Sequence, residues 1–296
     1  MRIGIGKGKI LAAIVTAALI LAIGWAEAQR QRGGRDRDRG GFGGFSSYST
    51  AGARDRAIFP GNKFTFCRVI YSEGRSRGGF RWDTDYPDSD INFSMRLAEV
   101  TTIDVNRDET WKTWDNPLGI VHKTLMLEDD DLWEYPILYL IEPGSLEFNP
   151  TERERLREYL LRGGFLHVDD FWGTQEWRNF EYEMSQVLPP DEFPMVDIPL
   201  DHPIFSIVFP VKEVPQVPSI GSWRSGRTSE RGWDSAVPHM YGIWDHNDRL
   251  MVVVTFNTDL GDGWEREGEN RDYFEEMSVK RAYPLGINIV VYAMTH

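Results

Sequence analysis

Residues 137–170 contain two short apolar segments joined by a helix, and this pattern constrains the fold more than any other part of the chain. The run at 137–141 is apolar without alternation and is flanked by prolines, which is typical of a strand covered on both faces. The next segment predicts a helix, because it begins with an N-cap, a proline at the first helical position and a capping-box glutamate: Asn149, Pro150 and Glu152. Gly163 and Gly164 end this helix, and 165–168 is the next predicted strand. Strand–helix–strand units of this kind are parallel and right-handed, so the chain is predicted to be an α/β protein with a mainly parallel sheet.

Other segments extend this sheet and cover it. Further strands are predicted from β-branched, aromatic and apolar content, the last two as a hairpin: 64–71, 101–105, 240–244 and 250–257. Helices are predicted at three further places: 88–97, 174–187 and 284–294. The Ile-Val-Val centre of the last of these also fits a strand. Residues 201–205 are expected to turn into a short extended segment, and 221–232 to form a mobile loop.

The N-terminal segment predicts an exported protein. Basic residues precede an apolar run at 10–23 and an Ala-Glu-Ala cleavage site, so residues 1–28 are expected to be a secretory signal peptide and the periplasm the expected compartment. The alternative is a retained anchor that contacts the membrane, but about 14 apolar residues are short for a bilayer span of roughly 20. Residues 29–63 are rich in Arg, Gly and Ser and predict a disordered linker, which leaves 64–296 as a single domain.

Charge and cysteine content exclude several classes of protein. The chain has a formal net charge of −13, and because residues 1–63 contribute +7, the remaining 233 residues carry −20. Such an acidic body disfavours nucleic acid as a partner. Cys67 is the only cysteine, so an internal disulfide is impossible.

Three clusters of the sequence combine carboxylates with a tryptophan: 82–88, 169–173 and 259–265. The last two follow predicted strands. If the strands at 64–71, 165–168 and 250–257 are parallel neighbours, their carboxyl ends open onto one edge of the sheet, where ligands bind in open α/β folds. The predicted ligand-binding residues are therefore Asp85, Asp169, Asp170, Trp172, Asp259, Asp262 and Trp264.

Convergent carboxylates have two chemical uses. Their oxygens can hold a divalent cation, or two of them can act as an acid and a base when their pKa values differ. A tryptophan beside them offers an apolar face to a sugar ring. Asp169 and Asp170 are the candidate catalytic residues, because two adjacent like charges after a buried strand are costly unless something compensates them.

Structural roles are the alternative for each of these residues. An aspartate at a strand end often caps the next helix, Asp262-Gly263 is a common turn pair, and a tryptophan after a strand is usually part of the core. His167 is expected to be a core residue, whereas His202 precedes a proline at a turn and is the one histidine of functional interest.

Six motifs follow one another between residues 84 and 296: TDYPDSDINFSMRL, YPILYLIEPG, LREYLLRGGFLHVDDFWG, DHPIF, NTDLGDGWE and YPLGINIVVYAMTH. Together they resemble the bacterial domain-of-unknown-function family numbered 4159, over essentially all of 64–296. More distantly, the helix, Gly-Gly and strand with a later Asp-His-Pro-Ile is similar to the trehalose-utilisation-like branch of the class I glutamine-amidotransferase-like fold. That likeness implies a flavodoxin-like three-layer sandwich with a hairpin addition. It does not imply a thiol mechanism, because aspartates stand at the turn where the nucleophilic cysteine would lie.

Two hypotheses for function follow. The first is a non-catalytic module that binds an unknown ligand or a cell-envelope protein at the acidic, tryptophan-lined edge. The second is a carboxylate-based hydrolase, with or without a divalent cation, acting on a carbohydrate.

Overall fold

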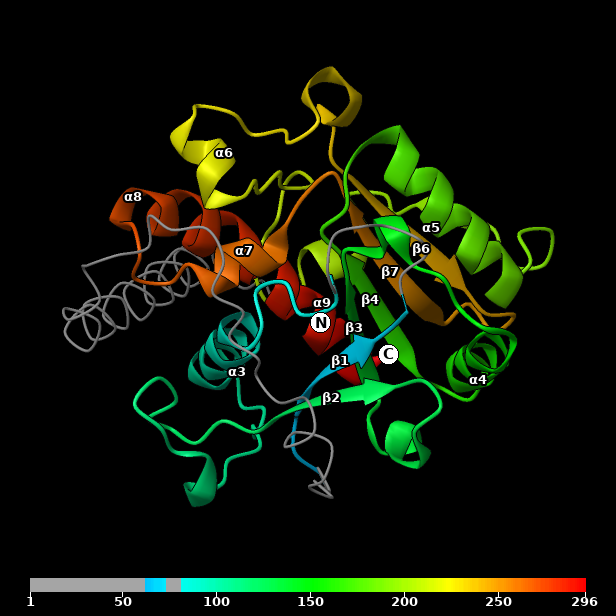
Figure 1. The fold of residues 1–296 in the computed structure, drawn as a ribbon, viewed down its shortest axis with the longest axis horizontal. Coiled ribbons are helices and arrows are strands. Elements are labelled where there is room, and N and C mark those ends of the chain that lie inside the picture. The colour runs from blue at the N-terminus through cyan, green and yellow to red at the C-terminus, as the bar shows by residue number, and fades with distance from the viewer. Residues whose placement is uncertain (1–61, 73–80) are drawn as a thin grey trace, which may run out of the picture.

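The computed structural model describes residues 62–72 and 81–296, which form a seven-stranded mixed sheet with helices on both faces (Figure 1). The strand order is β2-β1-β3-β4-β7-β6-β5. The first five strands in this order are parallel, and β6 and β5 run antiparallel to their neighbours. The strands are β1 (Phe66–Ile70), β2 (His122–Met126), β3 (Ile137–Ile141), β4 (Phe165–Asp169), β5 (Met195–Asp197), β6 (His239–Trp244) and β7 (Leu250–Phe256). The predicted α/β class, parallel crossover and hairpin are confirmed.

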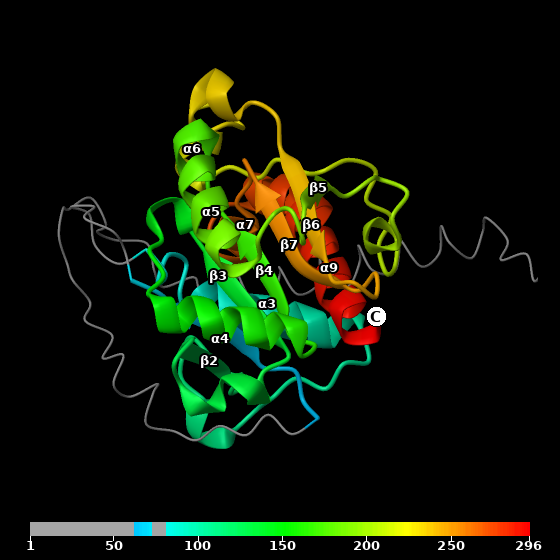
Figure 2. The ribbon, with the colours of Figure 1, turned by 90° about the vertical axis from the view of Figure 1, so that its right-hand side faces the viewer.

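Two hydrophobic cores separate the sheet from two layers of helices. Alternation along β3 shows the division, since Leu138 and Leu140 belong to the core beneath α4 and α5, whereas Tyr139 and Ile141 belong to the core beneath α3, α7 and α9. Figures 1 and 2 show the sheet between these two groups. The helices are α3 (Asp88–Val100), α4 (Pro150–Leu161), α5 (Gly173–Val187), α6 (Ile220–Arg224), α7 (Leu260–Glu265), α8 (Arg271–Tyr273), the π-helix η6 (Phe274–Ala282) and α9 (Tyr283–Thr295).

The crossover helix α4 has the caps that its sequence predicts. The Asn149 side chain accepts a hydrogen bond from the Glu152 backbone at 3.0 Å, and the Glu152 carboxylate accepts one from the Asn149 backbone at 2.8 Å. Gly163 follows the helix with a φ of 114°, a conformation that disfavours residues with a Cβ. The chain therefore enters β4 at a fixed angle, and Asp169 and Asp170 come at the carboxyl end of that strand.

Several local predictions were wrong. Residues 101–105 contribute only an isolated bridge from Val105 to Phe64, and the edge position is taken by β2 instead. Strand β2 carries the polar residues His122, Lys123 and Thr124, which hid it from a pattern based on apolar content. Their burial is possible because Lys123 pairs with Asp131 and the His122 ring packs against aromatic neighbours.

Two other segments also differ from expectation, and the helix predicted for a third, the C-terminal segment, is confirmed. Helix α6 and a 3-10 turn, η5 (Gly232–Ser235), lie at the two ends of the expected mobile loop. Pro203–Phe205 forms a 3-10 turn in place of an extended segment, and the His202 side chain caps it. The C-terminal segment is helical throughout α9, which excludes the strand alternative.

The predictions for residues 1–28 and for nearly all of 29–63 concern parts of the chain outside the described residues. Within 62–72 and 81–296, no helix combines the length and apolar character that crossing a bilayer requires.

Candidate acidic site at the carboxyl edge of the sheet

The carboxyl ends of the parallel strands bring acidic residues together from distant parts of the chain. Asp170 follows β4, Asp259 follows β7, and Asp85 precedes α3. Carboxylate oxygens of these three residues lie within 4.8 Å of one another. The sequence-based prediction that the three clusters converge is therefore met by one residue from each. We call these three residues the acidic triad.

The backbone at this edge is strained where the acidic residues are held. Asp85 and Asp170 have φ values of 61° and 55°, and Glu142 and Asn257, which follow β3 and β7, have 50° and 59°. Residues with a Cβ rarely adopt this left-handed conformation, which costs of order 1–3 kcal/mol and is found mainly at functional sites. The strain is concentrated on the edge that carries the triad.

Two residues of the triad are buried, the third, Asp85, is half-buried, and their hydrogen bonding is incomplete. Asp170 and Asp259 expose only 6% and 4% of their surface. Asp170 Oδ1 accepts a hydrogen bond from Trp172 Nε1 at 2.9 Å, and Asp259 Oδ1 accepts one from the Asp262 backbone at 2.6 Å. Asp85 Oδ2 is buried and has no hydrogen-bond partner within the described residues. No Lys or Arg of that part of the chain lies within 4.0 Å of a triad carboxylate, so nothing there pairs with the charges.

Burial and mutual repulsion raise the pKa values of all three triad carboxyls well above the ordinary range. For Asp170 the burial effect is followed by the charges of Glu142 and Asp85, and for Asp259 by those of Asp170 and Asp85. The pKa of Asp85 rises through burial and then through Asp262 and Glu265. Protons or a bound cation are the two ways to relieve this repulsion.

A second group of three carboxylates also includes Asp85, and an arginine already pairs with the other two. Oxygens of Asp85, Asp262 and Glu265 also lie within 4.8 Å of one another. Here Arg266 Nε lies 3.1 Å from Asp262 Oδ1 and 2.7 Å from Glu265 Oε2. Asp262 Oδ2 also accepts hydrogen bonds from the Ile220 backbone and the Tyr273 hydroxyl, at 2.7 and 2.8 Å. Asp262 therefore has its own partners, and they hold α7 against its neighbours.

Asp169 lies next to the triad, and both of its carboxylate oxygens accept hydrogen bonds. Its Oδ1 accepts from Thr255 Oγ1 at 2.5 Å, and its Oδ2 from the Tyr139 hydroxyl and from the backbones of Leu260 and Gly261. Burial raises the pKa of this carboxyl to about 6, against the opposing effect of these hydrogen bonds. This arrangement joins β3, β4 and β7 to the first turn of α7. Asp169 thus positions the loop that carries Asp259.

The expectation for His167 is met on the same network. Its ring is buried and Nε2 lies 3.0 Å from Thr255 Oγ1. Because Thr255 gives its proton to Asp169, the imidazole is the donor in this contact. Burial lowers the pKa of His167 to about 3, so the ring is neutral at physiological pH.

A glycine at the start of α7 makes room for Asp85. A Cβ on Gly261 would lie 2.6 Å from Asp85 Oδ2 and 3.0 Å from the Tyr139 hydroxyl. Every other residue would therefore displace the carboxylate that lacks a hydrogen-bond partner.

The two tryptophans lie beside the triad in different ways. Trp172 is 3% exposed and holds Asp170 through its indole N–H. Trp264 is 1% exposed and packs in the core, with its ring centroid 4.6 Å from that of Phe93. Neither ring therefore offers an open face to a ligand.

Two further glutamates near the triad, each paired with an arginine, were not predicted from the sequence. Glu142 pairs with Arg81, and Glu176 pairs with Arg231 at 2.8 Å. Glu142 comes directly after the predicted strand 137–141, so the strand-end rule that selected Asp170 applies to it equally. Arg231 lies in the segment 221–232, which was predicted to be a mobile loop and which contains three arginines in an acidic part of the chain.

A family model described as a domain of unknown function, DUF4159, matches residues 65–294. The chain belongs to this family. The match covers nearly all of the described residues and confirms the resemblance drawn from the six motifs. No curated protein matches the sequence of the chain. The description of the family gives no role for the triad, and the chemistry of the triad therefore follows from its own residues.

Proposed function

We propose that this DUF4159 domain is a non-catalytic binding module that holds a hard divalent cation with Asp85, Asp170 and Asp259. The observation that carries the proposal is the triad itself, in which three carboxylates lie within 4.8 Å of one another and one oxygen is buried without a hydrogen-bond partner. Carboxylate oxygens are the ligands that Ca²⁺, Mg²⁺ and Mn²⁺ prefer. A cation would neutralise the repulsion and complete the bonding of Asp85.

Support also comes from the cost of the arrangement without a cation. Buried carboxylates are stable when they are paired or neutralised, and the triad has neither an arginine nor a lysine at ion-pair distance among the described residues. The strained backbone at Asp85 and Asp170 adds to this cost. Features that destabilise the folded chain at one edge are expected where that edge binds a ligand.

We further propose that the protein acts after export, as its N-terminal segment predicts. Extracellular Ca²⁺ modules bind with Kd values of roughly 10⁻⁴ to 10⁻³ M, which makes Ca²⁺ the first ion to test. The bound cation would present its remaining coordination positions to a ligand or a cell-envelope partner.

A carbohydrate hydrolase is the less favoured alternative. It would use the tryptophans as walls for a sugar ring, but Trp172 and Trp264 are buried and offer no open face. Asp169, one of its candidate catalytic residues, is fully occupied by hydrogen bonds from the scaffold. Turnover of a glycan by the purified protein, lost in Asp170→Asn, would favour the hydrolase.

The test measures thermal unfolding and calorimetric binding of the full-length protein with Ca²⁺, Mg²⁺ and Mn²⁺ after treatment with a chelator. A cation present at 100 times its Kd stabilises the folded state by about 2.7 kcal/mol, which for a domain of this size raises Tm by about 5–10 °C. Asp170→Asn and Asp259→Asn should each abolish this increase. The asparagine at 259 retains the helix-capping oxygen, so folding is preserved.

The matched control is Asp130→Asn, which changes an exposed carboxylate outside the acidic edge. It should leave the cation effect unchanged. The proposal is wrong if none of the three ions stabilises the wild-type protein, or if both triad variants respond as the wild type does.

A further inference from the structure

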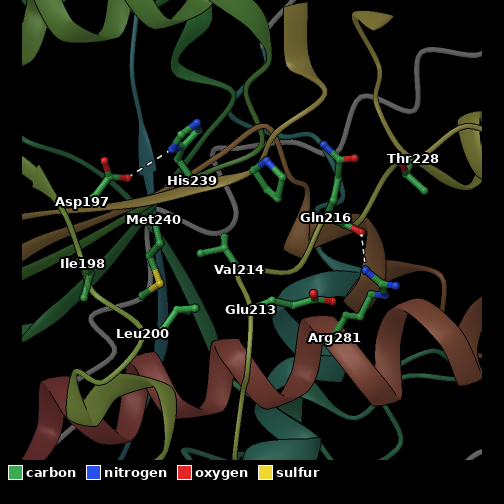
Figure 3. Close-up of a pocket in the computed structure, with 11 residues that line it drawn as sticks. Asp197, Ile198, Leu200, Glu213, Val214, Gln216, Thr228, His239, Met240 and Arg281 are labelled. Atoms are coloured by element: carbon green, nitrogen blue, oxygen red, sulfur yellow. Dashed lines mark hydrogen bonds and ion pairs between the residues drawn. The ribbon is translucent and has the colours of Figure 1, made fainter. Parts of the chain in front are cut away.

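A separate pocket of about 520 Å³ opens beside the antiparallel strands. Its volume falls within the range of about 300–1,000 Å³ that is typical of small-molecule sites. It is bounded by the end of β5, the beginning of β6, the segment 213–216 and Arg281 of η6 (Figure 3). None of its lining residues belongs to the acidic triad.

One side of this pocket is apolar. Ile198 and Met240 are 4% and 1% exposed, and Val214 lies between them and the polar side. At the upper edge His239 Nδ1 lies 3.3 Å from Asp197 Oδ1, so these two polar groups are engaged with each other. The apolar surface suits an aliphatic group of a few carbon atoms.

The opposite side carries two charges of opposite sign. Glu213 and Arg281 lie next to each other in Figure 3, but they form no ion pair within 4.0 Å. Arg281 Nη1 makes one long hydrogen bond, 3.4 Å, to the backbone oxygen of Gln216. Within the described residues no carboxylate lies at ion-pair distance from Arg281, so most of its guanidinium donors remain for a ligand.

Gln216 positions Arg281 through its backbone. Its amide nitrogen donates to the backbone oxygens of Ser235 and Asn257, at 2.9 and 3.1 Å, so the residue is held in place. Its side-chain amide points away from Glu213 and Arg281 in Figure 3, and only its backbone oxygen faces Arg281. The polar side thus has a cation and an anion next to each other.

We propose that this pocket binds a small zwitterion with an apolar side chain, the chemistry of a free aliphatic amino acid. Its carboxylate would pair with Arg281 in a bidentate contact, and its ammonium group would meet Glu213. The side chain would lie against Val214, Met240 and Ile198. This site is independent of the proposed cation site.

The test is calorimetric titration of the full-length protein with four probes. Leucine has all three features, 4-methylpentanoate lacks the ammonium group, leucinamide lacks the carboxylate, and glycine lacks the side chain. Leucine should bind tightest. The two probes that lack a charge should bind at least about tenfold more weakly, since each lost charged contact is worth of order one power of ten. Glycine should bind about as weakly, because it loses the burial of the apolar side chain.

Two variants assign the contacts. Arg281→Met should weaken leucine and 4-methylpentanoate alike by about tenfold, whereas Glu213→Gln should weaken leucine and leucinamide and leave 4-methylpentanoate unchanged. Arg178→Met changes an exposed arginine on α5 and is the matched control. Thermal unfolding of each variant confirms folding. Failure of leucine to bind at millimolar concentration, or equal leucine affinity in the wild type and Arg281→Met, would overturn the proposal.

Discussion

The chain buries carboxylates in two contrasting ways. Asp90 and Glu267 are neutralised by buried arginines, since Arg68 Nη2 lies 2.5 Å from Asp90 Oδ1 and Arg96 pairs with Glu267 through two nitrogens. Among the residues 62–72 and 81–296, the acidic triad has no such partner. The difference indicates that a cation from outside these residues is expected to supply the positive charge at the triad.

The largest effect that separates the two cases is expected from Arg68→Met. This change leaves Asp90 buried and unpaired, and it removes hydrogen bonds to the backbone oxygens of Trp82 and Thr84. Breaking a buried pair in this way costs about 3–5 kcal/mol. Urea unfolding followed by circular dichroism should show this loss, with or without a divalent cation.

A second change tests whether the loss comes from the unpaired charge. Arg68→Met combined with Asp90→Leu removes both charges, and apolar replacements of a buried pair are often neutral. The double variant should recover most of the lost free energy of unfolding. If a divalent cation instead restores the free energy of unfolding of the single variant Arg68→Met, then a cation can also compensate Asp90. The arginine-paired carboxylates and the triad carboxylates would then not be distinct.

Asp169→Asn should have the next largest effect. The amide replaces one of two oxygens that together accept four hydrogen bonds, so at least one buried donor loses its acceptor. We expect a loss of about 1–3 kcal/mol in the free energy of unfolding. Because Asp169 positions the loop before α7, cation affinity should also fall, though less than in Asp170→Asn. A variant of wild-type stability without cation binding would instead make Asp169 a ligand.

The parts of this site that the sequence predicts are those set by local signals. Caps and glycines define α4 and β4, and the strand order then brings the residues after parallel strands to one edge. Asp170 and Asp259 follow from this rule without any knowledge of contacts. The same rule selects Asp169, but it cannot foresee the four hydrogen bonds that this carboxylate accepts from β3, β7 and α7.

Compensation of charge could not be predicted, since it depends on contacts between distant residues. Arg68 is the one charged residue of its strand, and its partner Asp90 lies 22 residues away on α3. Lys123 likewise makes β2 look like a loop in the sequence, although its pairing with Asp131 allows it to be buried. Only the three-dimensional structure separates paired from unpaired carboxylates.

The pH dependence of stability should differ between the triad and its neutralised variant. A carboxyl whose pKa is raised in the folded state keeps its proton after the unfolded chain has lost it, above about pH 4. The free energy of unfolding without cation therefore falls as pH rises, by about 1.4 kcal/mol per pH unit for each proton retained. The raised pKa values of Asp85, Asp170 and Asp259 place this decline above the ordinary carboxyl range.

Urea unfolding in a chelator over a series of pH values measures this slope. Asp259→Asn should show a shallower decline than the wild type, and a saturating cation should flatten the wild-type curve. Asp169, with a pKa of about 6, contributes to both proteins and cancels in the comparison. Parallel curves for the wild type and Asp259→Asn would show that the triad does not retain protons.

The smallest effect is expected from Trp172→Phe, which alters one hydrogen bond of the triad. The indole N–H favours the charged form of Asp170, so its loss should raise the pKa of that carboxyl further. Protons then compete better with the cation, and the Kd for the cation should increase by up to about tenfold near neutral pH. The difference from the wild type should shrink as pH rises, because deprotonation removes the competition.

Trp177→Phe, in which the altered ring packs against Phe171 and Phe256, is the control for lost aromatic packing. A pH-independent change in Kd would mean that Trp172 acts by shaping the site, and an unchanged Kd would place Asp170 outside it.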